Sequence, residues 1–413
     1  MPAVQELQNA AGKAALPEEL PLEGAGADDA LERLAAVALE GAAVLDHPGY
    51  FAHMDPCACD EAIAASLLMT GTNQNMLHPD ASPSARDLER RVIDWLAPFF
   101  AMSGGHMVSG GSLANITAMW AAREAAGVRR VIASDRAHNS IVKAADLLQL
   151  ELVTVKSNPE THRITAASLE ASLVGDLSDA AVILTAGTVA VGAVDDLSIA
   201  ATHQAAWTHV DAAWCGPMML SEKLAPVLAG AKDADSVSFS AHKWLYQPKG
   251  SGVLLFKDAE KAHAKISYGA PTGLPAYLAT PTIGVLGSAP ATALPLMMTM
   301  LSWGRRGIAE RVEDDVAKAK EFARLVREDD RFDLWEKEGE EAVTGVTGIV
   351  AWRPKGWAPD PDAMQAIRVR LEGAWVSLAN IDGVTWFRSV AANPNADPQH
   401  VIDRVVDAIA VVQ

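Results

Sequence analysis

The sequence has little cysteine, a shortage of positive charge and no long apolar run. Its three cysteines, Cys57, Cys59 and Cys215, are too few for a disulfide framework, and the first two lack the second pair of ligands that a zinc site needs. We therefore expect no metal site and a reducing, cytoplasmic environment. No stretch reaches the length of a membrane span, and the first residues lack the apolar core of a secretory signal.

The balance of charged and apolar residues limits the class of protein. Lysine and arginine number 34 against 52 aspartate and glutamate residues, so the formal net charge is -18, which repels nucleic acid and anionic membrane surfaces. Apolar residues make up 50% of the 413-residue chain, enough to bury one large core and a smaller second one. The composition indicates a globular protein that binds neither nucleic acid nor membrane.

Short apolar runs alternate with alanine-rich helical segments between about residues 85 and 255. The runs VRRVIASD, LELVTVKS, AAVILTAG, AAWTHVDAAW and DSVSFSAHK each end in small or polar residues. This alternation predicts an α/β fold in which a mainly parallel sheet carries helices on both faces. Such sheets bind ligands just beyond the carboxyl ends of their strands, so candidate functional residues lie at those ends.

The segments on either side of this region predict smaller elements. Residues 1 to about 45 have a helical period and predict an arm that needs a surface to pack on. A long helical stretch, WGRRGIAERVEDDVAKAKEFARLVRE, follows the glycine- and proline-rich segment 267–295 and precedes a tail that reads strand, helix, strand, helix over 345–413. We expect an arm and pocket segment over 1–80, a large domain over 81–300 and a small α+β domain over 301–413.

Lys243 is the most informative residue. It follows the alternating strand SVSFS and the pair Ala241-His242. A lysine at a strand end is ordinarily a solvated charge. A lysine that carries pyridoxal phosphate needs a partly desolvated site that lowers its pKa, a carboxylate for the pyridine nitrogen, a flat group on the ring face and donors for the phosphate. The sequence offers a candidate for each of these.

Asp211, His138 and Thr188 are candidates for the ring of the cofactor. Asp211 ends the apolar strand THVD, so its burial requires a cation such as a protonated pyridine nitrogen, although a helix N-cap is an alternative role. His138 follows the strand VIAS, and a neutral imidazole could stack on the ring, although a lone histidine is more often structural. Thr188 follows AVILTAG and could bond the phenolic oxygen or cap the next turn.

The phosphate candidates surround a glycine-rich turn. In VSGGSLAN, Gly111 and Ser112 open the helix that continues as ITAMWAAREA. The free N–H groups of that helix and the Ser112 hydroxyl form an anion site, although capping alone also explains Ser112. Ser240, His242 and the Gly287-Ser288 pair could add donors, the last from a neighbouring subunit.

Taken in order, these segments resemble the group II pyridoxal-dependent amino acid decarboxylases. The likeness runs through HPGYF at 47–51, ASPSARDLE at 81–89, SGGSLAN, SDRAHNS, GTVAVGAVDDL, HVDAAW and SAHKW, and it covers about residues 45–260 better than the tail. It implies the fold of aspartate aminotransferase, called fold type I, with a seven-stranded type of sheet. It also implies a homodimer with active sites at the subunit interface, which would give the N-terminal arm a surface to pack on.

The resemblance also implies roles for individual residues. Lys243 would form the Schiff base, and Asp211 would pair with the ring nitrogen. His138 and Ala213 would pack on the two faces of the ring. The residues implied around the phosphate and the phenolic oxygen are Gly111, Ser112, Thr188, Ser240 and His242. The candidates for the substrate pocket are Tyr50, Phe51, His53, Leu77 and His78. They leave open whether the substrate side chain is apolar or polar.

Two departures from the family pattern bear on the reaction. The family's loop after the lysine strand is long and carries a tyrosine that protonates Cα, whereas here the loop is short, and Tyr268 or Tyr277 would take that place. The family's arginine-rich segment before the long helix is replaced by Gly287-Ser288-Ala289-Pro290, a pattern closer to cysteine desulfurase-like relatives. The cofactor is therefore better specified than the reaction.

The expected reaction is decarboxylation of an L-amino acid to its amine by a pyridoxal-phosphate carboxy-lyase. The alternative is another reaction on the same cofactor: transamination, elimination at Cβ or sulfur, or aldehyde formation. Arg388, in VTWFRS, lies where transaminases often bind the substrate carboxylate, and a bound carboxylate is hard to expel; a simple ion pair is its other possible role. A cofactor-free scaffold that keeps only the fold is the third hypothesis.

Overall fold

The computed structural model describes residues 16–172, 176–269, 282–336, 344–357 and 361–412. The chain divides into two compact units, Met1–Leu45 and Asp46–Gln413. The described part of the first unit contains α2 (Ala27–Leu39), whose first turn carries Asp28 and Asp29, where acidic side chains favour the helix dipole. A single helix of this length is marginal by itself, so α2 needs a further surface to pack on.

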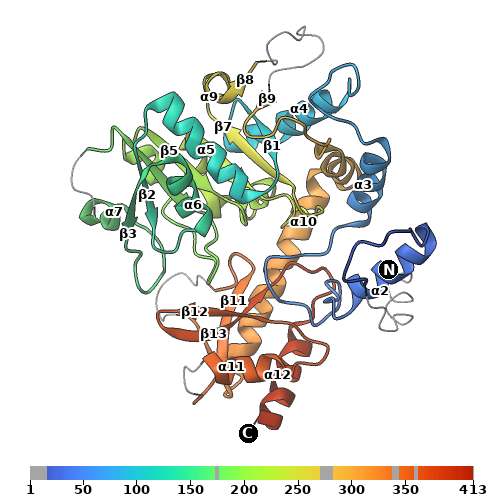
Figure 1. The fold of residues 1–413 in the computed structure, drawn as a ribbon. Coiled ribbons are helices and arrows are strands. Elements are labelled where there is room, and N and C mark those ends of the chain that lie inside the picture. The colour runs from blue at the N-terminus through green and yellow to red at the C-terminus, as the bar shows by residue number, and fades with distance from the viewer. Residues whose placement is uncertain (1–15, 173–175, 270–281, 337–343, 358–360, 413) are drawn as a thin grey trace. The chain divides into compact units, whose positions relative to one another are not determined.

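The second unit is built on a seven-stranded sheet (Figure 1). The strand order is β1-β7-β6-β5-β4-β2-β3. Strand β7 is antiparallel to both of its neighbours, whereas β6, β5, β4, β2 and β3 pair in parallel, which confirms the mainly parallel sheet. The strands are β1 (Gly104–Val108), β2 (Arg130–Ser134), β3 (Glu151–Val155), β4 (Ala180–Thr185), β5 (Trp207–Asp211), β6 (Ser236–Phe239) and β7 (Gly252–Phe256).

Helices cover both faces of this sheet, as the sequence predicts. Helices α5 (Gly111–Ala126), α6 (Asn139–Leu148) and α9 (Ala259–Ile266) share one apolar core with the sheet, while α4 (Ala85–Leu96) and the first half of α10 (Ala293–Glu328) share the other. Strands β4 and β5 are buried along their whole length because both faces are covered. No described helix has both the length and the apolar character needed to cross a membrane.

The remaining elements of this part are short. They are α3 (Asp60–Thr72), η1 (Ala97–Phe100), α7 (Ala166–Ser172), α8 (Ile199–Thr202), η2 (Gly216–Leu220), η3 (Ala225–Leu228), η4 (Ala231–Asp233), β8 (Ser267–Tyr268) and β9 (Thr282–Ile283). Strands β8 and β9 form a separate two-stranded sheet. Helix α10 includes the predicted helix over 303–328 and bends at Gly304, whose φ of 63° and ψ of 177° are not helical.

A four-stranded antiparallel sheet carries the second apolar core. Its order is β10-β11-β13-β12, and the second half of α10 packs on it together with α11 and α12. These elements are β10 (Phe332–Leu334), β11 (Ile349–Pro354), α11 (Pro361–Arg368), β12 (Ser377–Ile381), β13 (Val384–Val390) and α12 (Pro398–Val412). The prediction of one strand after α11 was wrong, because Asp382 and Gly383 form a two-residue turn with positive φ, which is the backbone of a tight hairpin.

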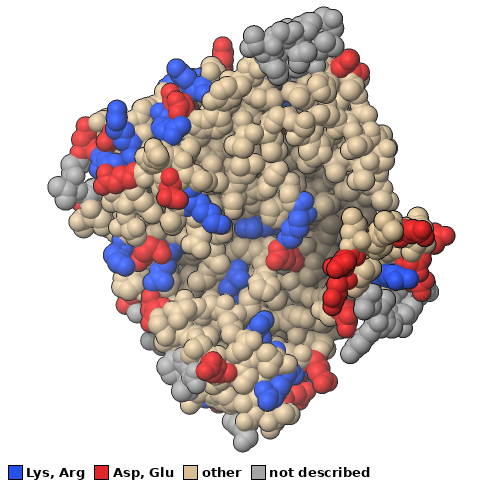
Figure 2. Space-filling view, viewed as in Figure 1, with Lys and Arg blue, Asp and Glu red and all other residues tan. Residues whose placement is uncertain are grey.

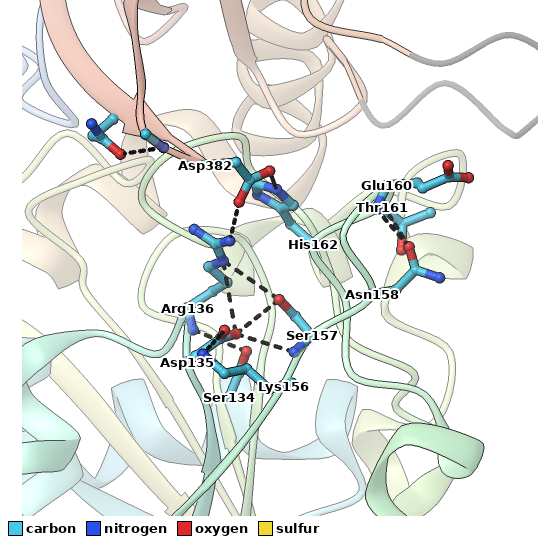
Figure 3. Close-up of polar contacts among 12 residues, drawn as sticks. Ser134, Asp135, Arg136, Lys156, Ser157, Asn158, Glu160, Thr161, His162 and Asp382 are labelled. Carbon is cyan, nitrogen blue, oxygen red and sulfur yellow. Dashed lines mark hydrogen bonds and ion pairs between the residues drawn. The ribbon is translucent and has the colours of Figure 1, made fainter. Parts of the chain in front are cut away.

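Asp382 joins this second sheet to the first (Figure 3). Arg136 Nη2 donates to Asp382 Oδ1 at 2.5 Å, and His162 Nε2 donates to Asp382 Oδ2 at 2.9 Å. Arg136 follows β2 and His162 follows β3, so the β12–β13 turn contacts the loops beyond two strand ends of the main sheet. Asp135 reinforces these loops, because its Oδ1 accepts from the Ser157 hydroxyl at 2.8 Å.

Candidate active site

A cavity of about 230 Å³ lies at the carboxyl ends of β4, β5 and β6 and at the start of α5. The predicted residues that line it are Gly111, Ser112, His138, Asp211, Ala213, Ser240, His242 and Lys243. The other lining residues are Met54, Ser109, Gly110, Asn115, Thr185, Gly187, Val189 and Trp214. Segments that are far apart in the sequence therefore meet at one edge of the sheet, as the fold class requires.

Lys243 lies in the turn that follows β6. Its backbone N–H donates to the Ser240 carbonyl at 3.2 Å, and the Tyr246 N–H donates to the Lys243 carbonyl at 2.9 Å. Burial lowers the pKa of Lys243; the negative charge of Asp211 opposes this effect, and the positive charge of Arg388 adds to it. A lowered pKa leaves more of the free amine at neutral pH, which is the form that attacks a carbonyl.

Asp211 ends β5 and is 3% exposed. Its Oδ1 accepts from the Ala213 N–H at 3.0 Å, and its Oδ2 accepts from Asn115 Nδ2 at 2.7 Å. Both partners are neutral, and no described lysine or arginine forms an ion pair with this carboxylate. The charge of Asp211 is therefore available to a cation in the cavity.

His138 is the N-cap of α6. Its Nδ1 accepts from the Ser140 N–H at 3.1 Å and lies 2.8 Å from the Ser140 hydroxyl. Burial lowers the pKa of His138; Asp211 opposes this effect, and Lys243 adds to it. The ring is therefore neutral, with its proton on Nε2, and it belongs to the lining of the cavity.

The turn from β1 into α5 forms a cradle in which glycine is required. Gly110 has a φ of 101°, and a Cβ on it would lie 3.0 Å from the ring of His242. A Cβ on Gly111 would lie 2.8 Å from Ser240 Oγ and 3.2 Å from the Ala213 side chain. The N–H groups at the start of α5 have no partner within the helix, so the cradle can hold an anion close to the backbone.

Sequence reasoning missed Thr185 and Asn115, which both line the cavity. The Thr185 hydroxyl is buried and has no hydrogen-bond partner among the described residues. The predicted Thr188 does not line the cavity, because its Oγ1 accepts from the Ala193 N–H at 3.0 Å within a turn. The position of Thr185 at the end of β4 was the signal that could have identified it.

Tyr268 and Ser288 also lie outside the Lys243 cavity of this subunit. Tyr268 is 62% exposed, and its ring stacks on Trp120 with the centroids 6.0 Å apart. The Ser288 hydroxyl accepts from Asn75 Nδ2 at 3.1 Å. The alternative tyrosine, Tyr277, lies outside the described residues.

The pocket candidates of the N-terminal segment have different environments. Phe51 is 1% exposed and packs on Phe322 with the ring centroids 5.2 Å apart, so it belongs to the second core. Burial and, to a smaller extent, the nearby charge of Asp55 together raise the pKa of Tyr50 to about 12. Burial lowers the pKa of His53, which also senses the charges of Asp55 and Arg388. Tyr50 and His53 therefore lie near a group of charged side chains.

Arg388, on β13, is a buried cation close to this site. It is 6% exposed, its Nη1 donates to the Ser377 hydroxyl at 3.3 Å, and its Nε has no partner among the described residues. Burial lowers the pKa of Arg388 to about 10, and Asp55 acts in the opposite direction. No ion pair of Arg388 exists within the described chain, so this cation is left for an anion from outside the protein.

The residues of the cavity fit pyridoxal phosphate. Lys243 offers an amine and the α5 turn an anion cradle. Among the described residues, the Asp211 carboxylate has no ion pair and the buried Thr185 hydroxyl has no hydrogen-bond partner. A hydroxyl of this kind is costly to bury unless a ligand completes its hydrogen bonds. The polar groups therefore match the amine-reactive, cationic, anionic and phenolic parts of that cofactor.

Comparisons with known proteins agree with this geometry. The family described as "Pyridoxal-dependent decarboxylase conserved domain" matches residues 11–347. L-2,4-diaminobutyrate decarboxylase of Rhizobium meliloti (strain 1021) is 30% identical over 428 residues, covering 95% of this chain and 83% of that protein. Aspartate 1-decarboxylase of Aliivibrio fischeri (strain ATCC 700601 / ES114) is 28% identical, and the alignment covers 70% of this chain and 61% of that protein.

A solved structure of Oryza sativa TDC with pyridoxal phosphate and tryptamine has a similar fold. The TM-score is 0.80 at 25% identity, and the match covers 96% of this chain and 89% of that one. Mouse CSAD also superimposes with a TM-score of 0.80, at 23% identity. These similarities confirm the predicted fold type I architecture.

Proposed function

This chain belongs to the pyridoxal-dependent decarboxylase family, and from that premise we propose that it removes the α-carboxylate of an L-amino acid as carbon dioxide and releases the amine. The observation that carries the proposal is the meeting of Lys243, Asp211 and His138 around one cavity. Such an enzyme is a pyridoxal-phosphate carboxy-lyase. Bound pyridoxal phosphate supplies the electron sink for the pair left on Cα when the carboxylate departs.

The cavity residues divide the tasks of holding that group. Lys243 would provide the amine that binds it covalently, and Asp211 would keep its ring nitrogen protonated. His138 and Ala213 would pack on the two faces of the ring. The α5 cradle, with Gly111, Ser112, Ser240 and His242, would hold the phosphate, and Thr185 rather than Thr188 would supply the hydroxyl for the phenolic oxygen.

The same residues control protons at the substrate. The lowered pKa of Lys243 provides a free amine that can accept and return a proton at Cα. Because Nδ1 of His138 accepts a hydrogen bond, the proton of the neutral ring is on Nε2, and this N–H can also donate. Tyr268 could serve as donor only from another subunit, because it does not line the cavity of its own.

Transamination is the second candidate, and Arg388 is the observation that favours it. A buried arginine without a carboxylate partner can bind the α-carboxylate of a substrate in two places at once. A carboxylate held in this way is difficult to expel, so the enzyme would instead transfer the amino group. The family match favours decarboxylation, in which Arg388 would help to bind the substrate but would have to release its carboxylate.

We also propose that the chain acts as a homodimer. Leu67, Leu68 and Leu301 are 72%, 57% and 66% exposed, and they lie on α3 and α10, which are side by side. Figure 2 shows few charged side chains on the surface over α3. A second copy would cover this apolar face and could bring Tyr268 or Ser288 towards its partner's cavity. Light scattering should show a dimer that Leu68→Asp weakens and the exposed control Leu147→Asp leaves intact.

We also propose the domain boundaries and a cytoplasmic location. The seven-stranded sheet falls within 81–300 and the four-stranded sheet within 301–413, which supports a large cofactor domain and a small C-terminal domain after an N-terminal segment over 1–80. The cysteines Cys57, Cys59 and Cys215 are free thiols, which supports a reducing cytoplasm.

The test is decarboxylation measured beside cofactor attachment. Wild type, Lys243→Ala and the control Lys257→Ala are supplied with pyridoxal phosphate and with 2,4-diaminobutyrate, aspartate, tyrosine or tryptophan, the amino acids named by related enzymes. We expect carbon dioxide and amine from the wild type and the control, and at least a ~1000-fold loss in Lys243→Ala. A keto acid with pyridoxamine phosphate would favour transamination, and no adduct at Lys243 after borohydride reduction would contradict the proposal.

A further inference from the structure

A chain of buried hydrogen bonds leads to Asp211 from within the protein. Trp207, His209 and Asp211 alternate along β5 and therefore face the same side of the sheet. Ser236 Oγ lies 2.8 Å from Trp207 Nε1 and 2.8 Å from His209 Nδ1. His209 Nε2 lies 3.0 Å from Asn115 Oδ1, and Asn115 Nδ2 lies 2.7 Å from Asp211 Oδ2. All five side chains are buried.

The chemistry of these groups fixes the direction of every hydrogen bond. A carboxylate only accepts, so Asn115 turns its NH₂ group to Asp211 and its oxygen to His209. His209 must then donate from Nε2. Burial lowers the pKa of His209 to about 4, so the ring is neutral and its Nδ1 accepts. Ser236 donates to that Nδ1 and accepts from Trp207, so all four hydrogen bonds point towards Asp211.

A branch of the same chain reaches His138. The second hydrogen of Asn115 Nδ2 goes to Ser140 Oγ at 2.9 Å, and the Ser140 hydroxyl donates to His138 Nδ1 at 2.8 Å. Asn115 Oδ1 also accepts from the Ser238 hydroxyl at 2.9 Å. Asn115 thus uses all four of its hydrogen-bonding positions, and it connects the residues that flank the cavity.

We propose that Asn115 and His209 are positioning residues that fix the orientation of the Asp211 side chain and the Nε2–H tautomer of His138, and that they thereby set the protonation of the cofactor's ring nitrogen. This inference rests on the proposed function, because it assigns the binding of pyridoxal phosphate to this cavity. Neither residue touches the reacting atoms; both act through Asp211 and His138.

The hydrogen-bonded side chains that lead to Asp211 are all neutral, and this suits them to orient its carboxylate. A lysine or arginine beside Asp211 would stabilise the carboxylate, but its charge would also compete with the protonated ring nitrogen. Oriented neutral donors stabilise the carboxylate and leave its charge for the cofactor. A histidine that titrated near neutral pH would reverse its Nδ1 contact, and the complete burial of His209 prevents this.

The first experiment measures how strongly Asp211 holds the ring nitrogen. Two probes are compared by fluorescence titration: pyridoxal phosphate and 1-deazapyridoxal phosphate, in which a carbon replaces that nitrogen. The proteins are wild type, Asn115→Ala, His209→Phe and His209→Gln, whose amide can donate to Asn115 and accept from Ser236. His263→Gln is the control, because His263 is a half-buried histidine that does not line the Lys243 cavity.

We expect the wild type and His263→Gln to bind pyridoxal phosphate more tightly than the deaza probe. In Asn115→Ala and His209→Phe, the ratio of the two Kd values should fall by about 10-fold, which is the range of a hydrogen bond to a charged group. His209→Gln should keep most of the wild-type preference. A purely structural role would weaken both probes equally and leave the ratio unchanged. An unchanged ratio in Asn115→Ala and His209→Phe, with the wild type binding pyridoxal phosphate, contradicts the inference. Failure of the wild type to bind pyridoxal phosphate at Lys243 contradicts the proposed function instead.

The second experiment needs no cofactor and no loss-of-function variant. Nitrogen NMR of the wild-type apoprotein labelled in histidine reports the tautomer of each ring, and His209→Gln assigns the His209 signals. We expect His209 to be neutral with its proton on Nε2 from pH 6 to 8, and His138 to have the same tautomer. A His209 ring that is protonated on Nδ1, or charged at pH 7, overturns the inference even if Asn115→Ala does not fold.

Discussion

Tyr246 donates its phenolic hydroxyl to the buried carboxyl group of Asp315 and thereby ties the turn after Lys243 to helix α10. Tyr246 has a φ of 55°, an unusual conformation for a large residue, and its carbonyl accepts from the Cys59 N–H at 3.0 Å. Asp315 is 0% exposed, and its Oδ1 has no partner among the described residues. The position of Lys243 therefore depends on a polar contact outside the cavity.

Asp315 should make the stability of the protein fall as the pH rises from about 4 to about 7. Burial raises the pKa of Asp315 to about 7, above its ordinary value, so the folded state keeps a proton that the unfolded state loses in that range. Asp315→Asn cannot ionise and serves as the reference. The unfolding constant of the wild type, divided by that of Asp315→Asn, should rise by up to ~10-fold per pH unit in that range. Urea unfolding at pH 5 and pH 8 measures this. The exposed Asp314→Asn is the control, and equal pH slopes for wild type and Asp315→Asn would contradict the prediction.

Asp382→Ala should destabilise the fold more than the loss of an ordinary ion pair. The change removes the acceptor of Arg136 and leaves His162, which is 0% exposed and whose Nδ1 already lacks a described partner, with both ring nitrogens unpaired. We expect a loss of about 1–3 kcal/mol in the free energy of unfolding. Asp179→Ala breaks an ion pair with Arg130 that is about as exposed as the Arg136–Asp382 pair but involves no buried histidine, so it should cost less than ~1 kcal/mol. Equal costs in the two variants would show that the Asp382 contact contributes nothing beyond its charges.

The main sheet could be predicted from the sequence because each parallel strand is a short apolar run that ends in a small or polar residue. Lys243, Asp211 and His138 follow such runs, so their meeting at one sheet edge follows from the parallel topology alone. Their chemical roles remain a prediction. The antiparallel β12–β13 hairpin also had a local signal, the Asp382-Gly383 pair, which the sequence interpretation did not use.

Asn115 and Asp315 could not be identified in this way, and strand ends alone do not decide between Thr185 and Thr188. Asn115 stands in an alanine-rich helix, where a polar side chain usually faces water, and only the packing of α5 on β5 and β6 buries it. The choice between Thr185 and Thr188 depends on a turn that closes back on Ala193. Tyr246 and Asp315 are 69 residues apart, and nothing local pairs them.

Gly111→Ala should weaken cofactor binding without unfolding the protein. The added Cβ would lie 2.8 Å from Ser240 Oγ, which can rotate, and 3.2 Å from the Ala213 side chain, which cannot. Because the phosphate and both residues share this cradle in the proposed site, we expect the Kd for pyridoxal phosphate to rise about 10-fold, measured by equilibrium dialysis. Gly24→Ala is the control, since nothing lies within 4 Å of its added Cβ. Unchanged affinity in Gly111→Ala would remove this turn from the phosphate site.

Arg388→Met should stabilise the apoprotein or leave its stability unchanged, while raising KM by about 10- to 100-fold. The guanidinium is buried without an anionic partner among the described residues, so its removal relieves an uncompensated charge, and the substrate loses a charge-assisted contact. Arg353→Met is the control, because Arg353 lies on the neighbouring strand β11 and pairs with Asp333. Thermal unfolding without substrate, and KM for carbon dioxide release with cofactor, give the two readouts. If Arg388→Met is destabilised and its KM is unchanged, Arg388 has a structural role. In that case neither decarboxylation nor transamination uses it to hold the substrate carboxylate.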